Sequence, residues 1–202
     1  SEYARAGCYL QVSRGVEPRS HSYTNTVPLQ ITMTIKNLAK LDLSVNTEGI
    51  RIRTCEDYRW GMCHIKTVQL LPAAIEQRKA KKAGLADTVF VSKQGHVREG
   101  TCTNIFIVKN QMLITHPLDN HILPGITRDV IIRKICKKEG LPVQERHYDI
   151  NEFYNADEAF LCSSVLKIQP IIEADGKKIG TGAPGTVTRN IQVDYDELVY
   201  HL

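Results

Sequence analysis

The chain has 202 residues, a formal net charge of +4, and 42% hydrophobic and 24% charged residues, which is typical of a soluble globular protein. Its apolar runs fall short of the roughly 20 residues of a membrane span, and no signal peptide is recognisable. We therefore expect a cytoplasmic protein that binds neither membranes nor nucleic acid, since the basic cluster over 78–82 reads as a solvated helix face. The six cysteines are scattered, which favours free thiols and fits no common zinc site, so no metal is expected.

Hydrophobic periodicity and turn residues predict alternating strands and helices. In chain order the predicted elements are strands over 8–13, 29–35 (half-buried) and 50–54, a helix over 68–84, strands over 88–92, 104–108 and 112–115, a helix from 123–127 to 138, a strand over 143–148, a short helix capped at 149, strands over 159–162, 169–174 and 177–179, and a helix over 186–200. Strands outnumber helices and several are joined by hairpin turns, so the predicted class is a mostly antiparallel α+β fold.

Lys66 is the first candidate for chemistry. It ends a largely apolar run ahead of the predicted helix, and a lysine at such a strand-to-helix junction can be partly desolvated. Desolvation lowers the pKa of an amine and makes it a usable nucleophile toward an aldehyde. Taken alone, this signal is weak, because most lysines are solvated surface charges.

Three features downstream add to this signal. Glu99 lies in a loop rich in Gly and Thr, just ahead of a predicted strand. Ile126 and Thr127 follow Gly125 at a predicted helix N-terminus, where unpaired N–H groups favour an anion such as phosphate. Ser163 and Ser164 end a predicted strand and offer hydroxyls to the same anion. A lysine, a carboxylate and a phosphate cradle are the parts of a pyridoxal-phosphate site.

Each feature also has an ordinary explanation. Glu99 could be a solvated loop carboxylate, the start of the second helix could be only a capped helix, and the two serines could form a turn. Spacing by itself leaves these alternatives open.

The order of the motifs narrows the choice. The chain resembles the fold-type IV pyridoxal-phosphate enzymes (the class IV aminotransferases), and within them most closely the D-amino-acid aminotransferases. The resemblance covers essentially the whole chain and is carried by residues 9–15, Arg59-Trp60, Ile65-Lys66, Glu99-Gly100, Asn104 to Phe106, Thr115 to Pro117, Gly125 to Asp129 and Pro170.

This resemblance implies a pseudo-barrel cofactor domain at 49–202, a hinge at 41–48, and at 1–40 the remainder of a smaller N-terminal α/β domain whose front portion is absent. Pyridoxal 5′-phosphate would be the cofactor. Lys66 would hold it as an internal aldimine and move the proton at the substrate, and Glu99 would pair with the ring nitrogen. Arg59 would contact the ring hydroxyl, and Ile126, Thr127, Ser163 and Ser164 would hold the phosphate. The implied reaction is a ping-pong transamination between a D-amino acid such as D-alanine and a 2-oxo acid such as 2-oxoglutarate or pyruvate.

Arg19 and His21 distinguish the members of the family. A guanidinium can bind a carboxylate bidentately and a nearby histidine can add a donor, as in the substrate clamp of D-amino-acid aminotransferases. In that family the loop reaches the site of the neighbouring subunit, so a homodimer is implied. The alternatives are an aminodeoxychorismate lyase or a branched-chain aminotransferase of the same fold type, or a truncated, inactive remnant.

Overall fold

The structure is a computed structural model that describes residues 6–24, 26–38 and 44–200. The chain divides into two compact units, Ser1–Asp42 and Leu43–Leu202, and each is described by itself. Residues 41–43 of the expected hinge lie outside the described part of the chain.

The first unit is built on a two-stranded antiparallel hairpin of β1 (Ala6–Ser13) and β2 (Gln30–Asn37). Its register places Leu10 opposite Met33 and Val12 opposite Ile31, so the apolar side chains of both strands share one face. No residue of β2 is buried, which corrects the expectation of a half-buried strand at this position. The alternation correctly predicted which side chains share one face of the strand. Burial of that face also requires another layer of structure that packs on it.

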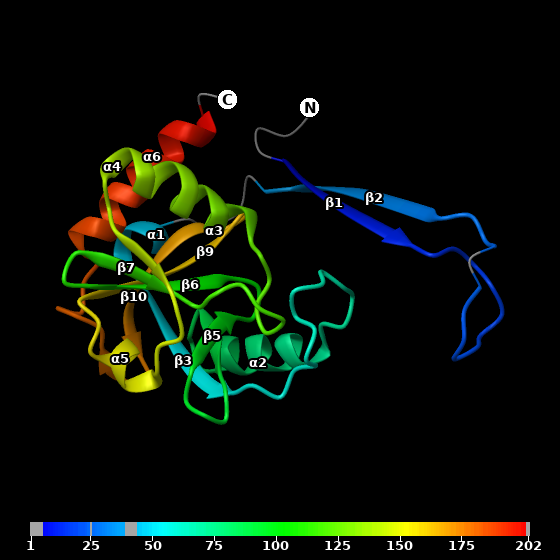
Figure 1. Cartoon of the computed structure of the whole chain (residues 1–202), viewed down its shortest axis with the longest axis horizontal. Helices are drawn as coiled ribbons and strands as arrows, with labels where there is room; N and C mark the ends of the chain where they lie inside the picture. Colours follow the sequence, from blue (N-terminus) through cyan, green and yellow to red (C-terminus); the bar gives the residue numbers. More distant parts are fainter. Residues whose placement is uncertain (1–5, 25, 39–43, 201–202) are drawn as a thin grey trace. The chain divides into compact units, whose positions relative to one another are not determined.

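The second unit is an α+β barrel (Figure 1). Its strands are β3 (Ile50–Glu56), β4 (Asp87–Val91), β5 (Val97–Gly100), β6 (Asn104–Lys109), β7 (Met112–Thr115), β8 (Val143–Glu145), β9 (Glu158–Ser163), β10 (Lys167–Ala174) and β11 (Lys177–Lys178). Within the described residues, β10, β3, β4, β5, β6 and β9 pair in a closed ring, because β9 pairs with both β10 and β6. Closure leaves these strands without a free edge.

Alternating side chains of the barrel strands build two cores. In β6, Ile105 and Ile107 join a cluster with residues of β3, β9 and β10, whereas Phe106 and Val108 join a second cluster on the other face. The ring of Phe106 stacks on Phe160 of β9 with centroids 5.0 Å apart. A strand that is buried on both faces needs a continuous apolar run, and β6 has one from Ile105 to Val108.

The helices cover the outside of the barrel. They are α1 (Val45–Glu48), α2 (Leu71–Lys82), α3 (Ile126–Val130), the π-helical turn η1 (Ile131–Cys136), α4 (Lys137–Glu139), α5 (Ile150–Tyr154) and α6 (Thr186–Tyr200). Figure 1 shows α3, α4 and α6 gathered on one side of the barrel, and α2 packs elsewhere, against β4. The helix predicted up to Lys138 exists, but a π-helical turn interrupts its α-helical geometry.

Local signals located most of these elements. The turn between β6 and β7 has Asn110 and Gln111 at φ of 50° and 61°, as a two-residue hairpin turn requires. The side chain of Asp149 accepts a hydrogen bond from the backbone N–H of Glu152, so the predicted cap of α5 is confirmed. Some bounds were wrong: α2 begins at Leu71 and not at residue 68, and β8 ends at Glu145 and not at residue 148. The elements β5 and α1 were not expected.

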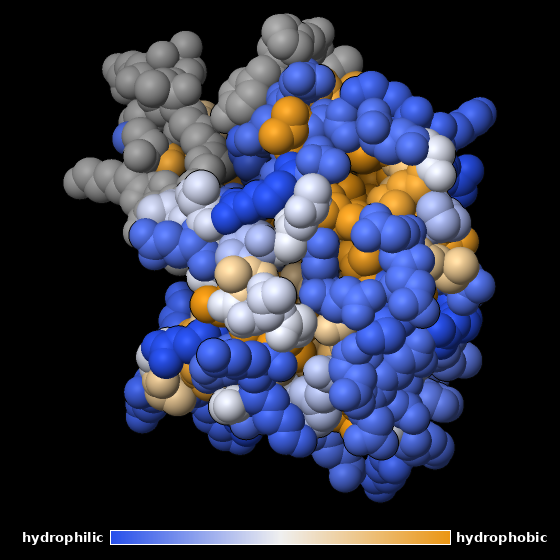
Figure 2. Space-filling view, turned by 90° about the vertical axis from the view of Figure 1, so that its left-hand side faces the viewer, coloured by the Kyte–Doolittle hydropathy of each residue, from blue (hydrophilic) through white to orange (hydrophobic). Residues whose placement is uncertain are grey.

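Polar and apolar side chains are unevenly spread over the surface of the described residues. The face in Figure 2 is largely hydrophilic, and hydrophobic side chains gather in one hollowed area of it. All six cysteines are free. Among the described residues, no helix is both long enough and apolar enough to cross a lipid bilayer, and no three His, Cys, Asp or Glu side chains are grouped as metal ligands.

Candidate active site

Lys66 lies in the irregular segment between β3 and α2. Pro72 stands in the first turn of α2, where its missing N–H costs nothing, and the helix therefore starts later than predicted. Lys66 is exposed, which corrects the expectation of a partly buried lysine at a strand-to-helix junction. Its ammonium acts on the thiol of Cys102: loss of hydration raises the pKa of Cys102, and Lys66 is among the charges that lower it. Lys66 thus lies near the turn that follows Glu99.

Glu99 lies in β5 and not in the loop predicted from its Gly and Thr neighbours. Its residue is 6% exposed, and the register places it opposite Asn104 of β6. One carboxylate oxygen, Oε2, accepts from the backbone N–H of Leu123 at 2.9 Å and from the side-chain amide of Asn104 at 3.2 Å. The other, Oε1, accepts from Nη1 of Arg59 at 2.6 Å. Burial raises the pKa of Glu99 to about 7, although Arg59 acts to lower it.

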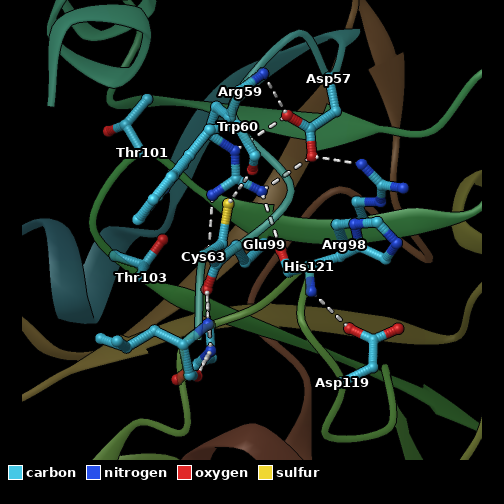
Figure 3. A network of polar contacts seen from close by, with 12 residues as sticks. Asp57, Arg59, Trp60, Cys63, Arg98, Glu99, Thr101, Thr103, Asp119 and His121 are labelled. Carbon is cyan, nitrogen blue, oxygen red and sulfur yellow. Dashed lines mark hydrogen bonds and ion pairs between the residues drawn. The ribbon is translucent and has the colours of Figure 1, made fainter. Parts of the chain in front are cut away.

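Arg59 joins Glu99 to a second buried carboxylate, Asp57 (Figure 3). Its Nε and Nη2 donate to Asp57 at 2.9 Å each, and Nη2 also donates to the backbone carbonyl of His121 at 3.1 Å. Burial would lower the pKa of Arg59, but the hydrogen bond to Asp57 and the charge of Glu99 raise it overall, so the group stays cationic. A guanidinium has five N–H donors, and these contacts use four of them.

The turn between β5 and β6 is fixed by a buried aspartate. Asp87, 3% exposed, accepts from the hydroxyl of Thr101 at 2.6 Å and from that of Thr103 at 3.0 Å. A Cβ at Gly100 would lie 2.1 Å from Oγ1 of Thr103, so the turn closes only around a glycine. This network explains the two threonines that follow Glu99 and it holds the end of β5 in place.

Ile126 and Thr127 begin α3, as predicted. The residue before them, Gly125, has no side chain that could cap the helix, and no side-chain cap is present. The first N–H groups of α3 are therefore free of the usual Ser, Thr, Asp or Asn cap. Thr127 is 3% exposed and its hydroxyl lies 3.3 Å from the hydroxyl of Tyr195 in α6.

Ser163 and Ser164 lie where β9 ends. α3, which carries Ile126 and Thr127, packs against this same strand β9. The Ser163 hydroxyl accepts from the backbone N–H of Leu166 at 3.2 Å, whereas Ser164 is exposed in the turn.

The segment that carries Leu123 connects Glu99 with the start of α3. The side-chain amide of Asn104 donates to Glu99 and also to the backbone carbonyl of Leu123 at 2.9 Å. A Cβ on Gly125 would lie only 2.0 Å from Oδ1 of the same amide. The buried carboxylate and the uncapped helix start are thus held by one asparagine.

Arg19 and His21 belong to the loop of the first unit, and both are exposed. In that loop the guanidinium of Arg14 lies 3.3 Å above the ring of Tyr23, and the hydroxyl of Thr24 donates to Glu17 at 3.1 Å. The loop is therefore ordered by its own side chains.

Four polar residues of this site were not singled out from the sequence: Asp57, Asp87, Arg98 and Asn104. Asp57 stands two positions before Arg59, and this close spacing of opposite charges could have identified it as a partner of Arg59. Asp87 carries no such signal, because Thr101 and Thr103 lie 14 and 16 positions further along the chain. Asn104 lies 5 positions after Glu99 and 19 before Leu123, so only the fold shows that one amide contacts both.

Residues 1–174 match the family described as amino-transferase class IV. The chain belongs to the class IV aminotransferases. It is 36% identical to a D-alanine aminotransferase of Bacillus licheniformis over 186 residues, which are 92% of this chain and 65% of that relative. The fold-type IV class inferred from the sequence motifs is confirmed by this match and by the solved structures of the family that the chain resembles.

Two solved structures show the range of this class IV fold. A branched-chain aminotransferase of Thermobaculum terrenum has a TM-score of 0.87 and 28% identity, covering 97% of this chain and 64% of that one. A putative 4-amino-4-deoxychorismate lyase of Legionella pneumophila has a TM-score of 0.84 and 25% identity, covering 95% and 69%. The chain thus spans about two thirds of the length of the relatives it matches.

Proposed function

We propose that this class IV aminotransferase transfers the amino group of a D-amino acid to a 2-oxo acid with pyridoxal 5′-phosphate as cofactor. The observation that carries the proposal is the connection of buried Glu99, through Asn104 and Leu123, to the uncapped start of α3. This arrangement offers a carboxylate for a pyridine nitrogen and, one short segment away, amide donors for a phosphate. The likeness to a D-alanine aminotransferase supports the choice of substrate.

The donors and acceptors of the described residues fit the cofactor. Gly125 leaves the helix start without a cap of its own, so an anion would meet free N–H groups there. Oε1 of Glu99 accepts a hydrogen bond from Arg59 and has a second acceptor position for a ring N–H. Nη1 of Arg59 has one further N–H that could reach the ring hydroxyl.

Each residue then has a distinct part in the proposed reaction. Pyridoxal phosphate supplies an electron sink that stabilises negative charge at the substrate Cα. Lys66 would hold the cofactor covalently and move the proton at Cα. Glu99 would keep the ring nitrogen protonated, and Arg59 would orient the ring. The phosphate would be bound by Ile126, Thr127, Ser163 and Ser164.

The remaining proposals concern substrate binding and assembly. Arg19 and His21 would bind the substrate carboxylate, and a homodimer would bring this loop to the site of the other subunit. The second unit would be the cofactor domain, and the first unit would belong to a smaller N-terminal domain. A cytoplasmic location stays a prediction.

The first experiment records the visible absorbance spectrum of the purified protein with pyridoxal phosphate, before and after addition of D-alanine or L-alanine. We expect the absorbance band of the lysine-bound cofactor to appear and then to be lost with D-alanine alone. Loss of the band with L-leucine would indicate a branched-chain aminotransferase. Pyruvate release from aminodeoxychorismate would indicate the lyase, and no band at all would indicate an inactive chain.

The variant Lys66→Ala tests the residue that is proposed to hold the cofactor. It should lose the absorbance band and all turnover, because no other amine is proposed to bond the aldehyde. Lys93→Ala, which removes a lysine whose side chain is 77% exposed, is the matched control and should behave as the unsubstituted protein. Near-normal transamination by Lys66→Ala would show that the assignment is wrong.

A further inference from the structure

Asp57 holds Arg59 with both of its oxygens. Oδ1 accepts from Nε and Oδ2 from Nη2, each at 2.9 Å, and the backbone N–H of Arg59 adds a third contact to Oδ1 at 3.0 Å. The Asp57 side chain is 1% exposed, and its own backbone N–H is tied to the carbonyl of Val91 at 2.8 Å. This is the bidentate geometry in which a carboxylate restrains a guanidinium most firmly.

The same guanidinium carries the contact to Glu99. Its three nitrogens lie in one plane, so fixing Nε and Nη2 on Asp57 also fixes Nη1, which lies 2.6 Å from Oε1 of Glu99. The ring of Phe90 lies 4.2 Å from the guanidinium carbon and closes one side. Arg59 is therefore shared by two carboxylates that are both almost removed from water.

A second arginine balances the charges. Nη1 of Arg98 donates to Oδ2 of Asp57 at 2.7 Å, and its side chain is 16% exposed. Two arginines and two carboxylates give this cluster a net charge of zero when Glu99 is ionised. Among the described residues, the thiol of Cys63 also senses the charge of Glu99, and its pKa is raised chiefly by burial.

We propose that Asp57 is a positioning residue that holds Arg59 against Glu99 and divides the charge of one guanidinium between two carboxylates, and so sets the charge that Glu99 presents to a ring nitrogen. The link to a ring nitrogen rests on the proposed function. The division of charge is a property of this chain alone and can be measured without a cofactor.

Two substitutions should shift the pKa of Glu99 in opposite directions. Asp57→Asn leaves the cluster with an excess positive charge, so the pKa of Glu99 should fall by about one. Arg98→Met leaves an excess negative charge and makes Asp57 depend on Arg59 alone, so the pKa of Glu99 should rise by a similar amount. If Asp57 only supported the local packing, both substitutions would loosen Arg59 and raise the pKa.

The experiment is a titration of the full-length protein without cofactor, with ¹³C-labelled glutamate carboxyls followed by NMR from pH 4.5 to 9. Glu99→Gln assigns the resonance. Glu56→Gln is the matched control, because it removes one negative charge next to Asp57 from a side chain that is 61% exposed, and it should leave Glu99 unchanged.

A fall with Asp57→Asn and a rise with Arg98→Met support the proposal. A rise in both variants, or no change in either, overturns it. If Asp57→Asn does not fold, Arg98→Met and the charge-conserving Arg98→Lys decide together. A rise with Met and no change with Lys support the proposal, whereas an equal rise with both, or no change with either, overturns it. Failure of the unsubstituted protein to bind pyridoxal phosphate would instead contradict the proposed function and leave the titration result standing.

Discussion

At the scale of single residues, Glu99 and Lys66 stand in contrasting surroundings. Glu99 is buried in a barrel strand and accepts three hydrogen bonds, whereas Lys66 is exposed in an irregular segment. Burial of a carboxyl group disfavours its charged form, so the surroundings of Glu99 and not its residue type set its protonation. Two predictions follow at this scale.

The first prediction concerns how the free energy of unfolding depends on pH. The pKa of Glu99 is raised from 4.5 to about 7 in the folded chain. Below pH 4.5 the carboxyl group is protonated in both the folded and the unfolded chain, and its contribution to the free energy of unfolding is fully present. Between pH 4.5 and 7 the unfolded chain releases the proton while the folded chain keeps it, so the free energy of unfolding falls as the pH rises. Glu99→Gln should lack this fall, which amounts to roughly 3–4 kcal/mol at most.

Urea denaturation at pH 4.5, 6 and 8 measures the difference between the two proteins. Glu56→Gln, at an exposed position, serves as the control and should retain the pH dependence. Parallel pH profiles for Glu99→Gln and the unsubstituted protein would show that Glu99 does not titrate in this window.

The second prediction concerns Arg19, which is proposed to bind the substrate carboxylate. Arg19→Leu should raise KM for D-alanine about tenfold or more while cofactor binding is unchanged, because a lost charge-assisted contact to the substrate weakens its binding. Arg133→Leu is the control, since this arginine is 74% exposed in the second unit and has no proposed contact with substrate. An unchanged KM would remove the clamp from the proposal.

At the scale of elements, the start of α3 depends on close packing with β6. Gly125 has φ of −68°, so a side chain there is not excluded by the backbone conformation. The obstacle is Oδ1 of Asn104, which would lie 2.0 Å from a Cβ and belongs to an amide already held by Glu99 and Leu123. The strand and the helix can approach only without that methyl group.

Gly125→Ala should therefore destabilise the protein by about 1–3 kcal/mol, as overpacking of a dense interior does. It should also weaken binding of pyridoxal phosphate, because Asn104 would have to leave Glu99. Thermal unfolding and a cofactor titration measure the two effects. Gly61→Ala is the control, since a Cβ there meets nothing within 4 Å, and equal behaviour of the two variants would contradict the argument.

At the scale of the whole molecule, the two units differ in how they are stabilised. The second unit has a closed ring of strands and two apolar clusters, whereas the described part of the first unit is a two-stranded hairpin whose strands are largely exposed. A hairpin alone is only marginally stable in water. Closure and burial stabilise the barrel through many contacts that form together.

Hydrogen exchange of the full chain tests this difference. Backbone amides of β1 and β2 should exchange at least about 100-fold faster than those of β6 and β9, which are buried on both faces. Mass spectrometry of peptides from the exchanged protein gives both rates in one experiment. Equal protection of β2 and β6 would show that the hairpin is covered in solution.

Local features of the sequence determined several secondary-structure elements and the family of this protein. Period-two alternation located β2 and β3, the Asp175-Gly176 pair marks the turn between β10 and β11, and the motif order around Lys66 and Glu99 identified the family. These features depend on residues that are neighbours in the chain, so they can be predicted from it.

Only the tertiary structure decided the surroundings of those residues. Glu99 lies in a strand, although its Gly and Thr neighbours predicted a loop, and Lys66 is exposed to solvent. Arg59 contacts Glu99, which is 40 positions away in the chain, and also Asp57. The physical reason is that burial, charge sharing and close packing arise between elements that meet when the barrel closes, and no periodicity within a single segment records which partner it will meet.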